Sequence, residues 1–333
     1  MAESELAARA RALVAELGLT AARVDLSVRP LTGGVASDIA VVTLPGREVC
    51  VKFALARLRV AADWRAPVHR NRAEYAWLSA AGAIVPGAVP QLFGWSAAQN
   101  GFAMEYLAGP DVRLWKAELL AGHVPPLAAA VGDVLGRIHA ASTAPGFDRT
   151  PFANAADFEA LRIEPYLRFT ATRHPALAGR LTALADGLAR ADAVLVHGDV
   201  SPKNILLRAQ RPVLLDAECA TMGDASFDPA FCLNHLILKA IHLPASRAAL
   251  MSQARALWSA YAHHVIWEPA ATLSARIAAL VPALMLARVD GKSPVEYLSP
   301  EGQARVRALS MPLIAEPPGS VPALIAQLES ALP

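Results

Sequence analysis

The residues that decide the fold read VHGDVSPKN at positions 196–204 and LLDAE at positions 214–218. A carboxylate, Asp199, precedes a carboxamide, Asn204, by five residues, and a second carboxylate, Asp216, follows twelve residues later. Mg²⁺ prefers hard oxygen ligands of this kind, and a hydroxyl that attacks a phosphoryl group needs a carboxylate to orient it and take its proton. The pattern predicts a phosphoryl-transfer site in which Asp199 is the base and Asn204 and Asp216 are Mg²⁺ ligands.

A simpler interpretation of these three residues is that they form turns or cap helices, as most loop carboxylates do. That interpretation does not explain three metal-compatible side chains in order, with strand-like apolar runs before and after the loop. The Asp-x4-Asn spacing is that of kinase catalytic loops, with His-Gly-Asp where protein kinases carry His-Arg-Asp. We therefore favour a catalytic role for the set.

Composition narrows the class of protein. A chain of 333 residues with 54% hydrophobic residues is long enough for one large domain or two lobes. The formal net charge of +2, without basic tracts, gives no case for nucleic acid. No uninterrupted apolar run is long enough for a membrane span, and the acidic start does not read as an export signal, so we expect a cytoplasmic protein. Cys50, Cys219 and Cys232 are too scattered for a disulfide framework or a zinc site and are expected to be buried thiols.

Hydrophobic periodicity predicts a β-rich region followed by a helical one. The first region should hold a helix at 3–17, a three-stranded antiparallel meander within 24–53, a helix around 72–78, and strands at 91–95 and 102–106. Beyond a Gly-Pro hinge at 109–110, helices are expected at 126–142, 155–169, 175–190, 227–242, 246–265, 270–289, 299–310 and 320–332. The fold class is therefore α+β and bilobal, protein-kinase-like, with a small antiparallel N-lobe (1–107, the hinge at its end) and a larger, mainly helical C-lobe (108–333).

Two features of the N-lobe suit nucleotide phosphates. Gly33 and Gly34 fall in the turn between two predicted strands, where glycine lets the backbone approach a phosphate closely. The alternative is an ordinary hairpin turn. Lys52 ends a β-branched strand, as the phosphate-pairing lysine of kinases does, although it could equally face solvent.

The following helix and the hinge complete the predicted nucleotide site. Glu74 is positioned to pair with Lys52 and hold it toward the phosphates, unless Arg70 or Arg72 occupies Glu74 instead. Glu105 and Leu107, at the hinge, are assigned to the nucleotide as well. The order of glycine turn, strand lysine, helix glutamate, hinge and catalytic loop supports these assignments together.

With these parts in order, the chain resembles the aminoglycoside phosphotransferase / choline kinase superfamily of small-molecule kinases over nearly its whole length. The resemblance is most specific at HGD-x4-N (197–204), DAE (216–218) and GDASFD (223–228). It implies ATP as co-substrate, Mg²⁺ as cofactor, Asp199 as base, and Asn204 and Asp216 as Mg²⁺ ligands. It also implies that Asp228 braces the catalytic loop, although Asp228 could serve as an N-cap as well.

Within that superfamily the chain looks most like 5-methylthioribose kinases. The shared features are KFAL (52–55), LWKAELLAG (114–122), DAECA (216–220), and Val60, Trp64, Pro67, Arg70 and Glu74. The chain departs from that family in two segments. Where this chain has DAECA (216–220), the family has Asp-Pro-Glu-Phe-Ala. Where this chain has HGDVSPKN (197–204), the loop of the family resembles His-Gly-Asp-Leu-His-Thr-Gly-Ser. The acceptor is therefore open.

Four further residues are assigned alongside the site. Glu218 is matched to the glutamate of the methylthioribose kinases, while Lys203, unusual in relatives, either touches phosphate or points outward. Arg288 is a candidate acceptor contact at the end of a helix, where arginine more often complements the helix dipole. His139 matches a frequent family feature and is expected to be structural.

The sequence thus predicts an ATP-dependent kinase that phosphorylates a hydroxyl of a small metabolite, sugar-like as methylthioribose is. An aminoglycoside or an amino alcohol such as choline or homoserine is the alternative acceptor. A non-catalytic, kinase-like nucleotide-binding module is the alternative of another class, although none of the expected catalytic residues is missing. A protein kinase is disfavoured because Asp-Phe-Gly and Ala-Pro-Glu motifs are lacking. No nucleic-acid or membrane partner is expected, and the sequence leaves the oligomeric state open.

Overall fold

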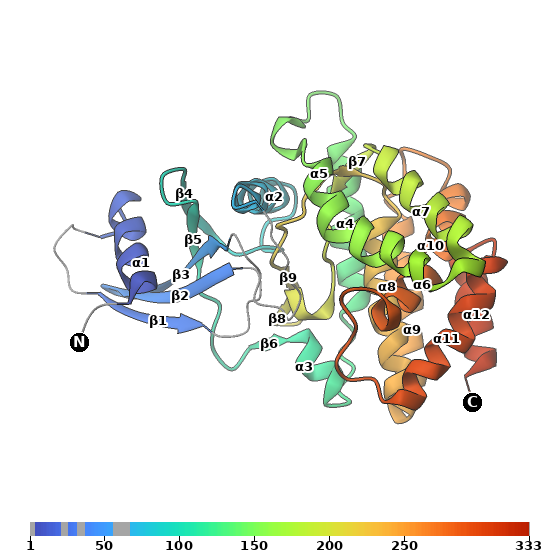
Figure 1. Cartoon of the computed structure of the whole chain (residues 1–333). Helices are drawn as coiled ribbons and strands as arrows, with labels where there is room; N and C mark the ends of the chain where they lie inside the picture. Colours follow the sequence, from blue (N-terminus) through green and yellow to red (C-terminus); the bar gives the residue numbers. More distant parts are fainter. Residues whose placement is uncertain (1–3, 21–25, 32–36, 56–66, 333) are drawn as a thin grey trace.

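The structure, a computed structural model, describes residues 4–20, 26–31, 37–55 and 67–332. An antiparallel sheet with two helices forms the N-terminal region, and a larger helical region follows it (Figure 1). The predicted α+β class and its division into a sheet region and a helical region are confirmed.

The N-terminal sheet separates two layers of side chains. Its strands in the described part of the chain run antiparallel in the order β1-β2-β3-β5-β4: β1 (Ser27–Leu31), β2 (Ser37–Leu44), β3 (Arg47–Ala54), β4 (Leu92–Ser96) and β5 (Gly101–Glu105). Successive strand residues point to opposite faces, so Val49, Val51 and Phe53 pack with α1 (Glu5–Glu16). Cys50 lies on the other face, in the core that contains Trp77 of α2 (Arg70–Ile84). The same alternation places Lys52 on the α2 side.

The chain passes from the sheet to the helical region just after β5. The next strand, β6 (Val112–Leu114), pairs with β8 (Ile205–Arg208), which in turn pairs with β9 (Arg211–Leu214). A second ribbon joins β7 (Val194–Val196) to β10 (Thr221–Gly223). The apolar runs that flank the VHGDVSPKN motif are therefore strands, as predicted, and they hold the loop at both ends.

The predicted helices of the C-terminal region are present with one correction. The helices are α4 (Ala128–Ser142), α7 (Ala178–Arg190), α8 (Phe227–His242), α9 (Arg247–Ala262), α10 (Ala270–Asp290), α11 (Pro300–Ala315) and α12 (Val321–Ala331), with a short α3 (Trp115–Leu120) that the sequence analysis did not identify. The predicted helix at 155–169 is wrong as a single α-helix: α5 (Ala155–Phe158) leads into a π-helical segment, η2 (Glu159–Arg168), and then α6 (Phe169–Arg173). Pro165 inside η2 lacks an N–H and its ring clashes with the preceding turn, so regular α-helical pairing cannot continue.

Burial in the core explains two compositional features. Cys50, Cys219 and Cys232 are buried free thiols, as predicted. In the described ranges, α10 is the one helix long and apolar enough to cross a membrane by length and composition, but 67% of that window is buried inside the protein. Because α10 packs against α8 and α11, its apolarity is that of a core helix.

Candidate active site

A buried carboxylate fixes the backbone at the start of the catalytic loop. Asp228 is fully buried, and its two oxygens accept the N–H groups of His197 (2.7 Å) and Gly198 (2.9 Å). The predicted brace is confirmed. The N-cap interpretation is wrong, because α8 begins at Phe227 and Ser226 occupies the N-cap position. His139, also buried, contacts Asp228 (3.3 Å) and Tyr261 (2.8 Å), which agrees with the structural role expected for it.

Only glycine fits at position 198. Its φ of +83° lies in the left-handed region, and a Cβ there would lie 2.8 Å from Cys219 Cβ and 3.0 Å from Cys219 O. The catalytic loop therefore packs directly on the segment that follows Asp216. This close approach explains the Gly in His-Gly-Asp.

His197 holds the loop in its neutral form. Its Nδ1 accepts the N–H of Asp199 (3.1 Å), so its Nε2 carries the proton and donates to the carbonyl of Leu215 (3.1 Å). Burial lowers the pKa of His197, which keeps it neutral. The imidazole thus joins the loop of Asp199 to the strand end that carries Asp216.

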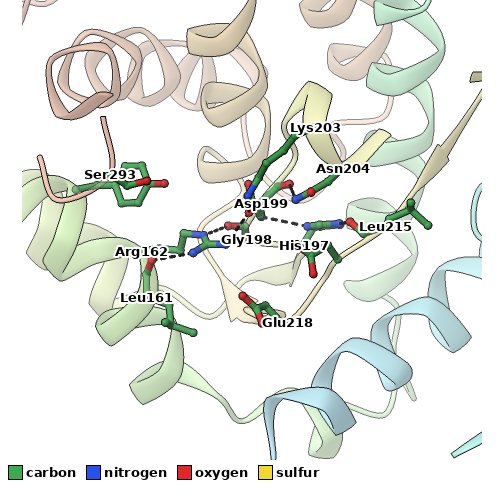
Figure 2. A network of polar contacts seen from close by, with 12 residues as sticks. Leu161, Arg162, His197, Gly198, Asp199, Lys203, Asn204, Leu215, Glu218 and Ser293 are labelled. Atoms are coloured by element: carbon green, nitrogen blue, oxygen red, sulfur yellow. Dashed lines mark hydrogen bonds and ion pairs between the residues drawn. The ribbon is translucent and has the colours of Figure 1, made fainter. Parts of the chain in front are cut away.

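Two cations hold the carboxylate of Asp199 (Figure 2). Arg162 Nη2 lies 2.9 Å from Asp199 Oδ2 and Lys203 Nζ lies 3.1 Å from the same oxygen. Burial alone would raise the pKa of Asp199, but the positive charges of Lys203 and Arg162 hold it well below its ordinary value. Asp199 is therefore ionised at neutral pH. Lys203, for which a phosphate contact or an outward position was open, lies against Asp199 with its side chain 48% exposed.

Arg162 belongs to the site although the sequence did not predict it. Its Nε donates to Gly198 O and its Nη1 to Leu161 O, so one guanidinium secures both the loop backbone and the Asp199 side chain. Arg162 lies between two buried residues, Leu161 and Ile163. An arginine flanked by apolar residues on both sides was the available signal, but its partner is 37 residues away in the chain.

On the N-terminal side, Lys52 lies between two carboxylates. Its Nζ is 2.7 Å from Glu74 Oε1, and it also donates to Asp216 Oδ1. Burial alone would lower the Lys52 pKa, but Asp216 and Glu74 raise it, so the lysine is charged. The predicted pairing with Glu74 is present, and it is not displaced by arginine because Arg70 instead reaches Glu218 (2.8 Å).

Arg70 and Glu218 form a second buried pair between the two regions. Their side chains are 0% and 8% exposed. Arg70 also donates to the carbonyls of Pro67 (2.9 Å) and Leu55 (2.7 Å), so one side chain connects α2, β3 and the segment after Asp216. Arg70 and Glu74 lie four residues apart on one face of α2. The helix therefore meets the segment at 216–218 directly through Arg70 and Glu218, and indirectly through Glu74 and Lys52.

Asn204 and Asp216 fit a Mg²⁺ ion. The Asn204 Nδ2 donates to the carbonyl of Asp199 (3.1 Å), which leaves its Oδ1 as the amide atom for a cation. Asp216 has a positive φ of +68°, a conformation that Asp tolerates better than most residues, and its contact with Lys52 uses Oδ1 only. Two protein oxygens, completed by phosphate oxygens and water, is a usual set for Mg²⁺.

Other predicted nucleotide contacts have different outcomes. Gly33 and Gly34 lie outside the described residues. The Glu105 side chain accepts from the N–H of Gln91 (3.2 Å) and from Arg208 (2.7 Å), so its carboxylate is engaged within the protein. Leu107 is half-buried just after β5.

Arg288, near the end of α10, contacts η2 and the segment that follows α10. Its Nη1 donates to Tyr166 OH (3.2 Å) and to Ser293, through both the Oγ (2.8 Å) and the carbonyl. Tyr166 belongs to η2, one turn from Arg162. In Figure 2, Ser293 lies on the same side of the catalytic loop as Arg162.

Solved structures share this architecture at low sequence identity. An amicoumacin kinase, hAmiN, in complex with AMP-PNP, Ca²⁺ and Ami superposes with a TM-score of 0.58 at 15% identity, covering 90% of this chain and 91% of that one. A choline/ethanolamine kinase family protein from Mesorhizobium loti gives 0.53 at 16% identity over 98% and 99%. The choline kinase LicA from Streptococcus pneumoniae gives 0.51 at 16% over 94% and 99%. At these identities the similarity establishes the fold alone.

Sequence comparison assigns the family. No curated protein is significantly similar to this chain. A family model described as "Phosphotransferase enzyme family" matches residues 27–273, which include both halves of the site from Lys52 to Asp228. The chain belongs to this phosphotransferase enzyme family (APH).

Proposed function

We propose that this phosphotransferase transfers the γ-phosphoryl group of Mg-ATP to a hydroxyl of a small metabolite, with Asp199 as the catalytic base. The observation that carries the proposal is the position of Asp199: a buried, ionised carboxylate in a braced loop, five residues before Asn204. Asp216 meets Lys52 at the strand end next to that loop. Acceptor, metal and phosphate groups thus each have a matching side chain within one continuous set of contacts.

On the nucleotide side, Lys52 binds phosphate oxygens and Glu74 fixes its position. With ATP bound, Asn204 and Asp216 would hold Mg²⁺, and the ion would supply positive charge that offsets the negative charge of the phosphates. Lys52 then exchanges its contact with Asp216 for one with phosphate, while its contact with Glu74 keeps its ammonium in place. Gly33 and Gly34 are proposed to line the phosphates, and the backbone of Glu105 and Leu107 to face the base.

On the acceptor side, Asp199 accepts a hydrogen bond from the reacting hydroxyl and orients its oxygen toward the γ-phosphorus. A bond forms between that oxygen and phosphorus as the bond from phosphorus to the β–γ bridging oxygen breaks, and the hydroxyl proton passes to Asp199. Arg162 and Lys203 keep Asp199 ionised, so it is a weak base before the reaction and takes the proton late. Positioning and charge stabilisation therefore provide most of the rate enhancement.

The acceptor proposed from sequence is sugar-like, as in methylthioribose. Shared features around Lys52 and Asp216 support it, whereas the Ser-Pro-Lys segment at 201–203 departs from that family. A polycationic aminoglycoside or an amino alcohol is the alternative. Residues 201–333 contain ten Asp or Glu and eleven Lys or Arg, so this part of the chain has no acidic excess to attract a polycation.

A panel of acceptors with Mg-ATP, read out by ADP release, tests the proposal. Methylthioribose, choline, homoserine and kanamycin represent the candidate classes. Calorimetry with Mg-ATP on the wild type and on Asp216→Ala provides the parallel measurement, and we expect the substitution to abolish most of the binding. If Mg-ATP binds but ADP is never released above the acceptor-free rate with any hydroxyl compound, the chain is a nucleotide-binding module and the proposal fails.

A further inference from the structure

Lys239 of α8 is a buried cation without a counter-charge. The residue is 1% exposed, and its ammonium lies 5.0 Å from the ring centre of Tyr297. Among the residues that the structure describes, no hydrogen bond or ion pair to the Lys239 ammonium is found. Burial, with smaller contributions from the neighbouring cations Lys116 and Arg288, lowers the pKa of Lys239 to about 7. An unpaired ammonium in the interior is costly unless a ligand compensates for it.

Arg288 provides a second cation that has only neutral partners. Its hydrogen bonds in the described part of the chain go to Tyr166 and Ser293, and its Nε is buried without a partner. The Tyr297 hydroxyl is likewise buried and unpartnered. Three polar groups from α8, α10 and the segment between α10 and α11 therefore have unused hydrogen-bonding capacity in one neighbourhood.

The carboxylates nearby do not neutralise this pair. Glu296, next to Tyr297 in the chain, is engaged with Lys116, and its side chain is 65% exposed. Asp199 is already held by two other cations. The positive charge of Lys239 and Arg288 is therefore left without an internal anion.

The η2 segment connects Arg288 to the catalytic loop, because Arg162 of η2 contacts Asp199 and Tyr166, four residues later, receives the hydrogen bond of Arg288. Phe231, His235 and Lys239 are spaced four residues apart and share one face of α8. The Phe231 ring contacts the Tyr166 ring at 5.6 Å, and Tyr166 receives the hydrogen bond of Arg288.

We propose that Lys239 and Arg288, with Tyr297 as a hydrogen-bond donor, bind an anionic group on the acceptor. The inference rests on the proposed function, because it places this anion on the molecule whose hydroxyl reaches Asp199. The acceptor is a hydroxylated acid of sugar size that carries a carboxylate or a phosphate. A cationic acceptor, whether an amino alcohol or an aminoglycoside, is disfavoured by the same two residues.

Four compounds that differ in charge on a similar carbon skeleton test the proposal: gluconate, glucose 6-phosphate, glucose and glucosamine. With Mg-ATP, we expect kcat/KM for one or both anions to exceed that for glucose by about tenfold or more, with glucosamine the poorest acceptor. Comparison of gluconate with glucose 6-phosphate identifies whether the site binds a carboxylate or a phosphate. Equal or better turnover of glucosamine would overturn the proposal.

Substitution then assigns the preference to residues. Lys239→Met and Arg288→Met should each reduce the ratio of anion to glucose kcat/KM by about tenfold or more. Lys292→Met is the matched control, because Lys292 is an exposed lysine paired with Glu164 and is next to Ser293 in the sequence. It should keep the wild-type ratio. Thermal melting of each variant establishes that it is folded, and an unchanged ratio in both site variants would contradict the assignment.

Direct binding separates this inference from the proposed function. Calorimetry without ATP, using Asp199→Asn so that turnover cannot interfere, measures the affinity for gluconate and glucose 6-phosphate. Anion binding that Lys239→Met abolishes in this background supports the site even if phosphoryl transfer is absent. Phosphoryl transfer to neutral or cationic acceptors without any anion binding would support the proposed function and contradict the anion site.

Discussion

Arg162 Nη2 lies 2.9 Å from Asp199 Oδ2, and the same guanidinium donates to the carbonyl of Gly198. The contact sets a fixed, buried cation on the carboxylate proposed as the base. It lowers the proton affinity of Asp199 and at the same time fixes the direction of its oxygens. We infer that the site favours orientation of the acceptor over basicity, which suits a loose phosphoryl-transfer transition state.

Arg162→Lys should reduce kcat by about 10²-fold, since a misplaced catalytic group costs about that factor. A lysine keeps the charge but cannot hold Gly198 and Asp199 at once. The KM for ATP should stay close to wild type, because Arg162 contacts neither Lys52 nor Asp216. Arg168→Lys, also on η2 but paired with Glu159 and Asp186 at the surface, is the control. Similar kinetics of the two variants would contradict a positioning role for Arg162.

Gly198→Ala should destabilise the protein more than Gly146→Ala. Both positions have positive φ, +83° and +90°, so each substitution should cost about 1–2 kcal/mol in backbone strain. Only at 198 does the new Cβ meet other atoms, those of Cys219, which adds about 1–3 kcal/mol of overpacking. Chemical denaturation measures both. If the two variants had equal free energies of unfolding, the catalytic loop would accommodate the added methyl group without overpacking.

Glu74→Gln should raise the KM for Mg-ATP by about tenfold while leaving stability nearly unchanged. The substitution removes the charge that orients Lys52, a contact worth about 1.5–3 kcal/mol. Burial raises the pKa of Glu74, so a neutral side chain of the same shape is tolerated there. Glu164→Gln, which alters a partly exposed pair with Lys292, is the control for steady-state kinetics and melting. A wild-type KM for ATP would remove Glu74 from the nucleotide site.

Lys239→Met should stabilise the protein, and more so at acid pH. The pKa of Lys239 is lowered from 10.5 to about 7, so the folded protein binds fewer protons than the unfolded chain between these values. The cost of charging Lys239 is fully present below pH 7 and declines as the pH rises toward 10.5. The difference in unfolding free energy between variant and wild type, a few kcal/mol at pH 6, should therefore shrink steadily by pH 9. The charged and titratable groups around Lys239 include Lys116 on α3, Cys232 and His235 on α8, Arg288 on α10, and Glu296 and Tyr297 beyond it. If the difference in unfolding free energy between variant and wild type did not change with pH, protonation of Lys239 would not destabilise the folded protein.

The features that could be predicted from the sequence are those that depend on neighbouring residues. The VHGDVSPKN motif, its flanking strands and the period of the C-terminal helices follow from neighbouring residues, and the structure places them as expected. The pairing of Lys52 with Glu74 was also within reach, because strand alternation and helix spacing orient both side chains. Arg162 and Lys239 were not predictable, since their importance depends on partners, or a lack of partners, in distant segments. The π-helical turn at η2 was missed although Pro165 marks it, because a helical hydrophobic period alone does not distinguish the two helix types.

The most direct test of the account is Asp199→Asn, assayed for both phosphoryl transfer and Mg-ATP binding. Asparagine keeps the shape but cannot accept the hydroxyl proton, so turnover with the best acceptor should fall by about 10²–10⁴-fold. Calorimetric affinity for Mg-ATP should stay within a few-fold of wild type, because Lys52, Asn204 and Asp216 are untouched. Asp192→Asn, at an exposed carboxylate outside the loop, provides the control. A variant Asp199→Asn that turns over near the wild-type rate would contradict the assignment of the base and, with it, the proposed mechanism.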